Sequence, residues 1–295
     1  MKEREVRIKN RKYLHSSLIK SIIVQVNVLM PSNPLIKKYV EAIYLFKRGS
    51  EVSEYFAYPS LHTAVALFRD ADVLYNDARV TISPSHKERF AAMASNRLHR
   101  TTAIKYVCMV DEIAINFRPP GFSLFTGREP RKNNFPFDNW DAQLPKMMNA
   151  VFSTEDKNEQ LAVIEAFLLT QYEPIECEDM IDKVIAMLCD FNSELSIQDI
   201  ADSCGVHYKY LSRCFVKYVG CSAAHFRKVA RFRASVQAKL RQDNQLNFTG
   251  ICYDNNFTDQ SYFIKQFKEL TGESPGMFFK DVSSFADSHI VWKFL

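Results

Sequence analysis

A chain of 295 residues is long enough for two domains, each with its own hydrophobic core. Hydrophobic residues make up 47% and charged residues 24%, a globular balance that excludes a disordered chain. No apolar run approaches the roughly 20 residues of a membrane-spanning helix, and basic residues 1–12 lack the apolar segment of a secretory signal. We therefore expect a cytoplasmic protein with no membrane partner. The net charge of +4 by itself indicates little about other partners.

Residues 18–117 contain six stretches that are rich in Val, Ile, Tyr and Phe and separated by Pro, Asn, Asp or Gly. The stretches are Leu18–Leu29, Val40–Phe46, Ala64–Phe68, Ala78–Ile82, Ala103–Cys108 and Ile113–Phe117. Strands at such short intervals indicate an antiparallel barrel or sandwich. We predict a β-rich, barrel-like N-terminal domain over residues 1–137.

From residue 138 the apolar spacing changes to the period of a helix. The predicted apolar faces are Leu144, Met147, Met148 and Val151 on one helix, and Leu161, Ile164, Leu168 and Leu169 on the next. Pro174 disfavours a helix that continues through it. We therefore predict a helical connector over residues 138–173, an all-α domain over 174–282 and a tail over 283–295, which makes the fold class α+β with several domains.

Two stretches of the predicted all-α domain resemble each other. One is Ile200-Ala-Asp-Ser-Cys-Gly-Val206 with Tyr210-Leu-Ser-Arg-Cys-Phe215, and the other is Ile251-Cys-Tyr-Asp-Asn-Asn-Phe257 with Tyr262-Phe-Ile-Lys-Gln-Phe267. Each has the parts of a helix-turn-helix unit: a short helix, a turn residue that tolerates positive φ, and a second helix with apolar residues at i and i+4. Gly220 and Gly272 are predicted to end the second helices, and residues 223–241 to form the helix that links the units.

Positive charge is concentrated between His207 and Arg241, where there are nine Lys or Arg residues and no Asp or Glu. The nine are Lys209, Arg213, Lys217, Arg227, Lys228, Arg231, Arg233, Lys239 and Arg241. A basic stripe opposite phosphates supplies sequence-independent affinity for nucleic acid. A solvated helix face is the alternative interpretation, but together with the repeat the stripe favours double-stranded DNA. The linking helix would span about 28 Å, which suits two helices in successive major-groove segments about 34 Å apart.

Residues 181–279 resemble the DNA-binding domain of the AraC/XylS family of bacterial transcription regulators. The resemblance depends on Phe257-Thr-Asp-Gln-Ser-Tyr-Phe-Ile-Lys-Gln-Phe-Lys268 and Gly272-Glu-Ser-Pro275. Asn256 replaces the family's usual Gly, Cys252 its usual Ala, and Phe279 an Arg that is common there. The resemblance implies a sequence-specific regulator, associated with the bacterial nucleoid, that inserts two recognition helices into DNA without a cofactor and, if it is an activator, contacts RNA polymerase.

The predicted DNA-contacting residues lie on the two recognition helices and the linking helix. They are His207, Tyr208, Lys209, Ser212, Arg213, Lys217, Arg227, Arg231, Gln260, Ser261, Ile264 and Lys265. Lys209, Ser212 and Arg213 share one helix face because they are spaced i, i+3 and i+4. Arg213 is the type of residue that donates two hydrogen bonds to guanine, whereas Ile264 suits a thymine methyl group or contributes less specificity.

Members of this family often carry a β-rich N-terminal sensor that binds a small molecule or pairs two protomers. The runs Tyr58–Phe68 and Ile113–Phe125 resemble such a domain, so the resemblance implies a small-molecule effector and a homodimer as partners. His62, Arg118, Phe122 and Phe125 are the candidate pocket residues. For each of them a structural role in a strand end or an aromatic core is the more frequent alternative.

Two other function classes remain open at this stage, a DNA-repair enzyme and a protein-binding adaptor that use the same helical domain. The repair enzyme would need an activated cysteine or a cysteine zinc cluster, but none of the seven cysteines forms a CxxC pair and Cys204, His207 and Cys214 match no zinc pattern. No GxSxG, HExxH, GxGxxG or phosphate-loop motif occurs. We therefore predict no enzyme and no metal, and the basic stripe disfavours the adaptor.

Overall fold

The computed structural model describes residues 26–50, 52–137, 140–193, 195–241, 260–281, 283–285 and 290–294. The elements of the N-terminal part are β1 (Val26–Leu29), α1 (Pro34–Tyr39), β2 (Val40–Phe46), β3 (Ser53–Ala57), β4 (Thr63–Arg69), β5 (Ala71–Tyr75), β6 (Arg79–Pro84), β7 (Phe90–Asn96), β8 (Thr102–Tyr106), β9 (Asp111–Phe117), α2 (Gly121–Thr126), β10 (Asn133–Pro136), α3 (Leu144–Phe152) and α4 (Lys157–Gln171). They are followed by α5 (Glu178–Cys189), α6 (Ile197–Ser203), α7 (Tyr208–Val219), α8 (Ala223–Arg241), α10 (Gln260–Thr271), α11 (Pro275–Asp281), β11 (Ser283–Phe285) and β12 (Ile290–Phe294).

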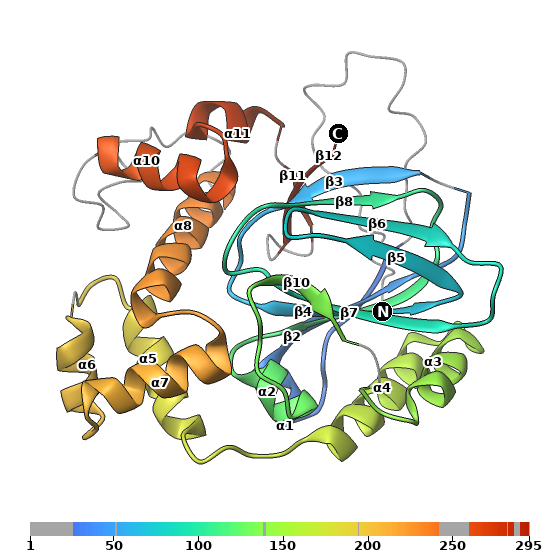
Figure 1. Ribbon diagram of the computed structural model, residues 1–295, viewed down its shortest axis with the longest axis horizontal. Helices are drawn as coiled ribbons and strands as arrows, with labels where there is room; N and C mark the ends of the chain where they lie inside the picture. Colours follow the sequence, from blue (N-terminus) through green and yellow to red (C-terminus); the bar gives the residue numbers. More distant parts are fainter. Residues whose placement is uncertain are drawn as a thin grey trace.

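The strands form two six-stranded sheets that pack face to face (Figure 1). The first sheet has the order β1-β2-β9-β4-β7-β10 and the second β11-β12-β3-β8-β6-β5. Tyr44, Phe68 and Met93 of the first sheet pack in one core with Val80 and Ile104 of the second. The β-rich prediction is confirmed, but the sheets do not close into the barrel-like form that the strand spacing suggested.

The other face of the first sheet is covered by α1 to α4. Ile43, Leu67 and Ile115 point to this side, where they share a core with Met148 of α3 and Leu168 of α4. Because side chains alternate along a strand, β2, β4 and β9 are buried on both faces. All four predicted apolar residues of α3 are buried, whereas in α4 the predicted Leu169 is 43% exposed.

The helices from α5 onward build a further core around Leu211, Phe215, Phe263 and Phe267, with α8 running between its two halves (Figure 1). This core also takes in Tyr58 and Leu98 from the N-terminal domain. The ring of Tyr58 lies edge-on to that of Phe278, with centroids 4.6 Å apart. The two domains are thus joined by continuous apolar packing.

Several strands differ from the sequence prediction. Strand β2 has the predicted bounds, and β4, β6, β8 and β9 overlap their predictions, while only residues 26–29 of Leu18–Leu29 are described. Strands β3, β5, β7 and β10 were not predicted. The predicted tail over residues 283–295 contains strands, and β12 pairs with β3 in the second sheet of the N-terminal domain. None of the helices in the described part of the chain is long and apolar enough to cross a membrane.

Candidate nucleic-acid interface

The first helix-turn-helix unit is built from local capping interactions. Helix α6 begins at a capping box, in which the Asp199 N–H donates to Ser196 Oγ at 3.1 Å and the Ser196 N–H donates to the Asp199 carboxylate at 3.0 Å. The chain then reverses at Gly205, whose φ of 68° is the left-handed conformation that the sequence predicted. The Val206 N–H donates to the Ala201 carbonyl at 3.1 Å and closes the turn.

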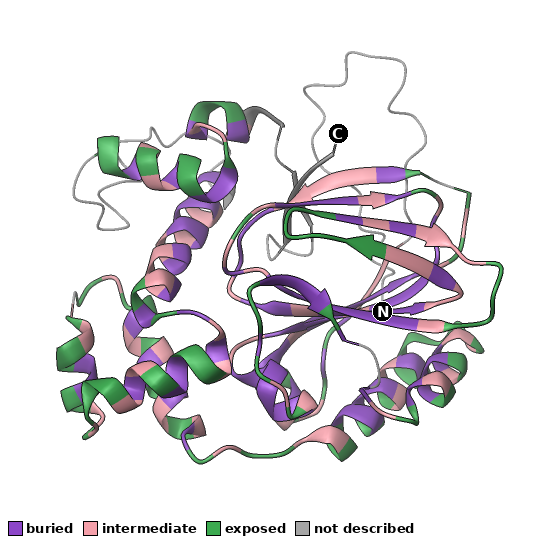
Figure 2. Ribbon diagram, viewed as in Figure 1, coloured by how far each residue is buried: buried purple, intermediate pink, exposed green. Residues whose placement is uncertain are grey.

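Helix α7 has a buried face and an exposed face. Leu211 and Phe215 are fully buried, as predicted from their i, i+4 spacing. On the opposite side Lys209, Arg213 and Lys217 are exposed, and Figure 2 shows buried and exposed stretches alternating along α7. Of the other predicted contact residues on α7, Tyr208 is exposed and Ser212 is half-buried. The helix therefore presents three cations to solvent along one edge.

His207 is exposed, and it also has a structural role at the start of α7. It is the N-cap of α7, and its Nδ1 accepts the backbone N–H of Lys209 at 3.1 Å. This hydrogen bond satisfies one of the free N–H groups of the first turn. His207 therefore orients the start of the helix that carries Lys209 and Arg213.

Helix α8 directs several of its cations inward, which corrects the prediction of a continuous basic stripe. Arg233 and Lys239 are only 6% and 8% exposed. Lys228 forms an ion pair with Glu269 at 2.6 Å, and Arg227 donates to the Leu195 carbonyl at 2.7 Å. The reason is that α8 is enclosed by both domains, so that only part of its circumference faces solvent.

Arg227 and Arg231, which were predicted to contact DNA, are both half-buried. The guanidinium of Arg227 is engaged by the Leu195 carbonyl. Neither residue presents a fully exposed cation, unlike those on α7. The exposed cationic surface of the first unit is therefore carried by α7 rather than by α8.

The second unit is described from α10 onward, and its predicted turn at residues 251–257 lies outside the described residues. Gln260, Ser261 and Lys265 are exposed on α10, as the prediction requires. Ile264 is half-buried and packs against the helical core, so that its side chain is not fully available to a base. Gly272 follows the helix with a φ of 80°.

Two histidines join the first unit to the N-terminal domain. The Nε2 of His99 lies 3.0 Å from the Gly220 carbonyl, and the Nε2 of His225 lies 2.8 Å from the Leu98 carbonyl. The two rings stack with centroids 5.2 Å apart and an interplanar angle of 14°. Since a carbonyl only accepts, each Nε2 donates in this arrangement.

The environment of His99 favours its neutral form. Burial lowers the pKa of His99, the hydrogen bond to the Gly220 carbonyl raises it, and nearby His225, Lys132 and Arg100 lower it further. Protonation of His99 in the folded protein is therefore opposed by burial and by the neighbouring cations, although the hydrogen bond to the Gly220 carbonyl favours it.

A cavity of about 80 Å³ lies between the two sheets of the N-terminal domain and reaches α8. Its walls are the apolar and aromatic side chains of both sheets, and its polar groups include Arg97, Glu112, His62 and Arg233. Burial raises the pKa of Glu112 to about 7, although the Tyr106 hydroxyl and the Arg97 guanidinium lower it. The Tyr106 hydroxyl donates to Glu112 at 2.6 Å.

The guanidinium of Arg97 supplies an unsatisfied donor to this cavity. Its Nη1 is buried and has no hydrogen-bond partner among the described residues. The sequence did not predict Arg97, Glu112 or Arg233 as pocket residues, and it placed Arg233 in the basic stripe. One signal in the sequence could have indicated a polar group inside the domain. Glu112 is a charged residue directly before Ile113, which begins a predicted buried strand.

Of the four predicted pocket residues, only His62 lines this cavity. Phe122 and Phe125 of α2 are buried in the apolar core on the opposite side of the first sheet. Arg118 donates to the carbonyls of Lys37 and Val40, both at 3.1 Å, and so holds α1 in place. Phe122, Phe125 and Arg118 are therefore removed from the candidate pocket.

His62 does not form a catalytic triad, although Ser60 and Glu41 lie beside it. Its Nδ1 lies 3.0 Å from Ser60 Oγ and 3.2 Å from the Glu41 carboxylate. A triad requires the hydroxyl and the carboxylate on different ring nitrogens, so that the imidazole accepts the serine proton at one nitrogen while the carboxylate orients it at the other, and this arrangement does not meet that requirement. Burial lowers the pKa of His62, while the Glu41 carboxylate raises it.

Comparisons with known proteins place a recognisable domain in the C-terminal part. Residues 200–281 match the family model described as a helix-turn-helix domain, which confirms the predicted units. No curated protein matches the sequence.

Solved structures of ToxT from Vibrio cholerae are similar to most of the chain. One has 13% identity, covers 87% of this chain and 96% of its own, and has a TM-score of 0.42. Another has 10% identity, covers 87% and 97%, and has a TM-score of 0.45. A third, bound to (E)-4-(8-methylnaphthalen-1-yl)but-3-enoic acid, has 13% identity, coverages of 86% and 98%, and a TM-score of 0.43. At these values the similarity carries no argument about function.

Proposed function

We propose that this chain, which carries an AraC-type helix-turn-helix domain in residues 200–281, is a sequence-specific DNA-binding transcription regulator. The observation that carries the proposal is the exposed cationic edge of α7, formed by Lys209, Arg213 and Lys217. A helix of this width fits the major groove, where Arg213 contacts a base edge and the lysines contact phosphates.

The second recognition helix, α10, lies at the other end of α8 (Figure 1). Helix α8 has 19 residues and so spans about 28 Å. Successive major-groove segments on one face of DNA are about 34 Å apart, so the two helices enter neighbouring segments of one site. Gln260, Ser261 and Lys265 supply the polar contacts of the second helix, and the half-buried Ile264 limits its contribution to specificity.

The test is selection of bound sequences from random duplex DNA, followed by a salt titration on the selected site. Binding should weaken linearly with the logarithm of salt concentration. Arg213→Ala should lose about tenfold in discrimination at one base position, because a bidentate contact to guanine is removed. Lys146→Ala on α3, an exposed cation far from α7, is the matched control. Equal behaviour of the two variants would contradict this assignment of the recognition face.

The regulator is further proposed to respond to a small-molecule effector in the N-terminal cavity. The unsatisfied Arg97 Nη1 and the aromatic walls suit a compact ligand with a hydrogen-bond acceptor. Arg233 of α8 lines the same cavity, so a ligand there contacts the helix that sets the spacing of the two units. A ligand that binds the two domain arrangements unequally would shift their populations.

A thermal-shift screen of small metabolites tests this part of the proposal. A ligand of the cavity should stabilise the wild-type protein but not Ala66→Leu, which fills the space with a larger side chain. A ligand that stabilises both equally binds elsewhere.

A homodimer through the N-terminal domain and a contact with RNA polymerase stay predictions. Light scattering after size-exclusion chromatography checks the first. Pull-down of the polymerase with the DNA-bound regulator checks the second.

A further inference from the structure

A segment of the N-terminal domain, residues 128–132, lies against the C-terminal end of α7. Gly220, which ends α7, is packed so closely on it that an added Cβ would lie 2.9 Å from the Pro130 carbonyl oxygen and 3.1 Å from Pro130 Cγ. Pro130 itself is buried. The hydrogen bond from His99 to the Gly220 carbonyl holds the same junction. The segment is therefore fixed in position relative to the first recognition helix.

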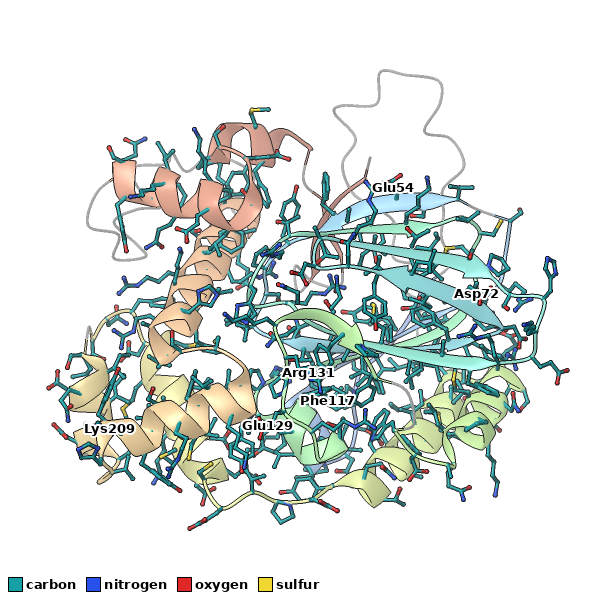
Figure 3. All side chains as sticks on the ribbon, viewed as in Figure 1. Glu54, Asp72, Phe117, Glu129, Arg131 and Lys209 are labelled. Carbon is teal, nitrogen blue, oxygen red and sulfur yellow. The ribbon has the colours of Figure 1, made fainter. Side chains whose placement is uncertain are left out.

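The segment and the helix together form the two sides of an open groove. Helix α7 and its C-cap contribute Tyr208, Lys209, Ser212, Arg213, Val216, Lys217 and Gly220, and the segment contributes Glu129, Pro130 and Lys132. Figure 3 labels Glu129 and Arg131 beside the C-terminal end of α7 and Lys209 toward its other end. The residues predicted to contact DNA thus share a surface with a part of the chain that the family-model match does not include.

The charges of this groove suit an anionic partner. The lining of the groove contains one acidic residue, Glu129, and four basic residues, which are Lys132, Lys209, Arg213 and Lys217. In the described part of the chain, neither Lys132 nor Arg213 forms an ion pair, and Arg131 next to them is exposed. Among the described residues, no ion pair therefore neutralises the charge of Lys132 or Arg213.

We propose that residues 129–132 are part of the DNA interface, with Lys132 as a phosphate contact beside the base pairs that α7 reaches. This inference rests on the proposed function of α7 as a recognition helix. The major groove is about 12 Å wide, so a helix inserted in it has a phosphate strand on each side. Duplex DNA carries one charge per roughly 1.7 Å of its axis, so a cation held beside α7 meets phosphate.

Glu129 opposes the same phosphates, because its carboxylate lies in the groove. The negative charge of Glu129 therefore lowers the affinity for DNA, and the positive charges of Lys132 and Arg131 partly offset this loss. The consequence is that the N-terminal domain takes part in DNA binding directly, in addition to any effect it has on the disposition of the two units.

The experiment measures the affinity of the full-length protein for its selected DNA site and for unrelated DNA between about 50 and 200 mM salt. Lys132→Gln should reduce the steepness of log affinity against log salt by about one. Over this roughly fourfold range of salt, the affinity of the variant should therefore fall by a factor roughly fourfold smaller than that of the wild type. The change should be the same on both DNAs, because a phosphate contact carries no base preference. Glu129→Gln should bind both DNAs more tightly.

Lys146→Gln on α3 is the matched control and should keep the wild-type slope. If Lys132→Gln also keeps the wild-type slope while Arg213→Ala loses base discrimination, this inference is wrong and the proposed function stands. If Lys132→Gln binds more tightly, the segment obstructs DNA rather than contacting it. If the wild-type protein shows no salt-sensitive binding, the proposed function fails and this inference fails with it.

Discussion

Replacing Gly220 by Ala tests how tightly the first helix-turn-helix unit is joined to the N-terminal domain. Gly205, Gly220 and Gly272 all have left-handed backbones, with φ of 68°, 81° and 80°. An added Cβ meets nothing within 4 Å at Gly205 or Gly272. At Gly220 it would lie 2.4 Å from Asn96 Nδ2 and 2.9 Å from the Pro130 carbonyl oxygen. The three substitutions thus share backbone strain and differ in the contact between domains.

The expected loss of stability is the sum of two costs, which are the strain of the left-handed backbone and the overpacking against the N-terminal domain. A left-handed backbone costs an alanine about 1–2 kcal/mol, so Gly205→Ala and Gly272→Ala should each lower the free energy of unfolding by about that amount. Gly220→Ala adds the cost of overpacking, about 1–3 kcal/mol, for a total of about 2–5 kcal/mol. The Asn96 amide is at the end of a side chain and can turn away. The Pro130 oxygen belongs to the backbone, so that relief there requires the domains to move apart.

The assay is urea denaturation of the full-length protein and its three variants at neutral pH. Limited proteolysis of the segment between α4 and α5 reports separation of the domains independently, and Gly220→Ala alone should accelerate it. If Gly220→Ala is no more destabilising than both control variants and its proteolysis is unchanged, the close packing of α7 on residues 128–132 is refuted.

Three further outcomes are expected. The pKa of His99 is lowered in the folded protein, so the unfolded chain binds a proton more readily. The free energy of unfolding should therefore fall as the pH drops through about 6.5. The midpoint of urea denaturation should fall less over this pH range in His99→Gln than in the wild type. Glu112 should give the opposite pH dependence, because its pKa of about 7 lets the folded protein retain a proton that the unfolded chain releases. The free energy of unfolding should fall as the pH rises from about 4.5 to 7, and this fall should be absent in Glu112→Gln. Arg233→Ala and Lys239→Ala should leave the salt slope of DNA binding unchanged, because both side chains are buried; a lowered slope would show that they reach DNA.

Local sequence determined the helix-turn-helix units. Gly205 and Gly220 mark the turn and the end of α7 because few other residues tolerate a positive φ there. Leu211 and Phe215 identify the buried face because an i, i+4 pair must point the same way on any helix. These are short-range constraints, so they were predictable without knowing what packs against them.

Strand prediction succeeded where the sequence has a run of β-branched and aromatic residues, and it failed where no such run occurs, as in the Ala-rich but buried β7. Strand β2 has apolar residues on both faces, since one face meets the second sheet and the other meets helices, and its bounds were predicted correctly. Strand β5 is an edge strand with Leu74 73% exposed, and its sequence gave no comparable apolar run. The pairing of β12 with β3 joins residues more than 230 positions apart and left no local signal.

Sequence alone thus predicted where the two helices proposed to contact DNA lie and which of their faces is apolar, because backbone conformation and helical period are local properties. Only the tertiary structure decided which cationic side chains are exposed to solvent and which are buried. Arg233 and Arg213 have the same chemistry, yet one is enclosed by the N-terminal domain and the other faces solvent. It also placed Lys132 beside α7 and brought Arg97 and Glu112 into one cavity. These outcomes depend on contacts between distant segments, which no pattern within a single element records.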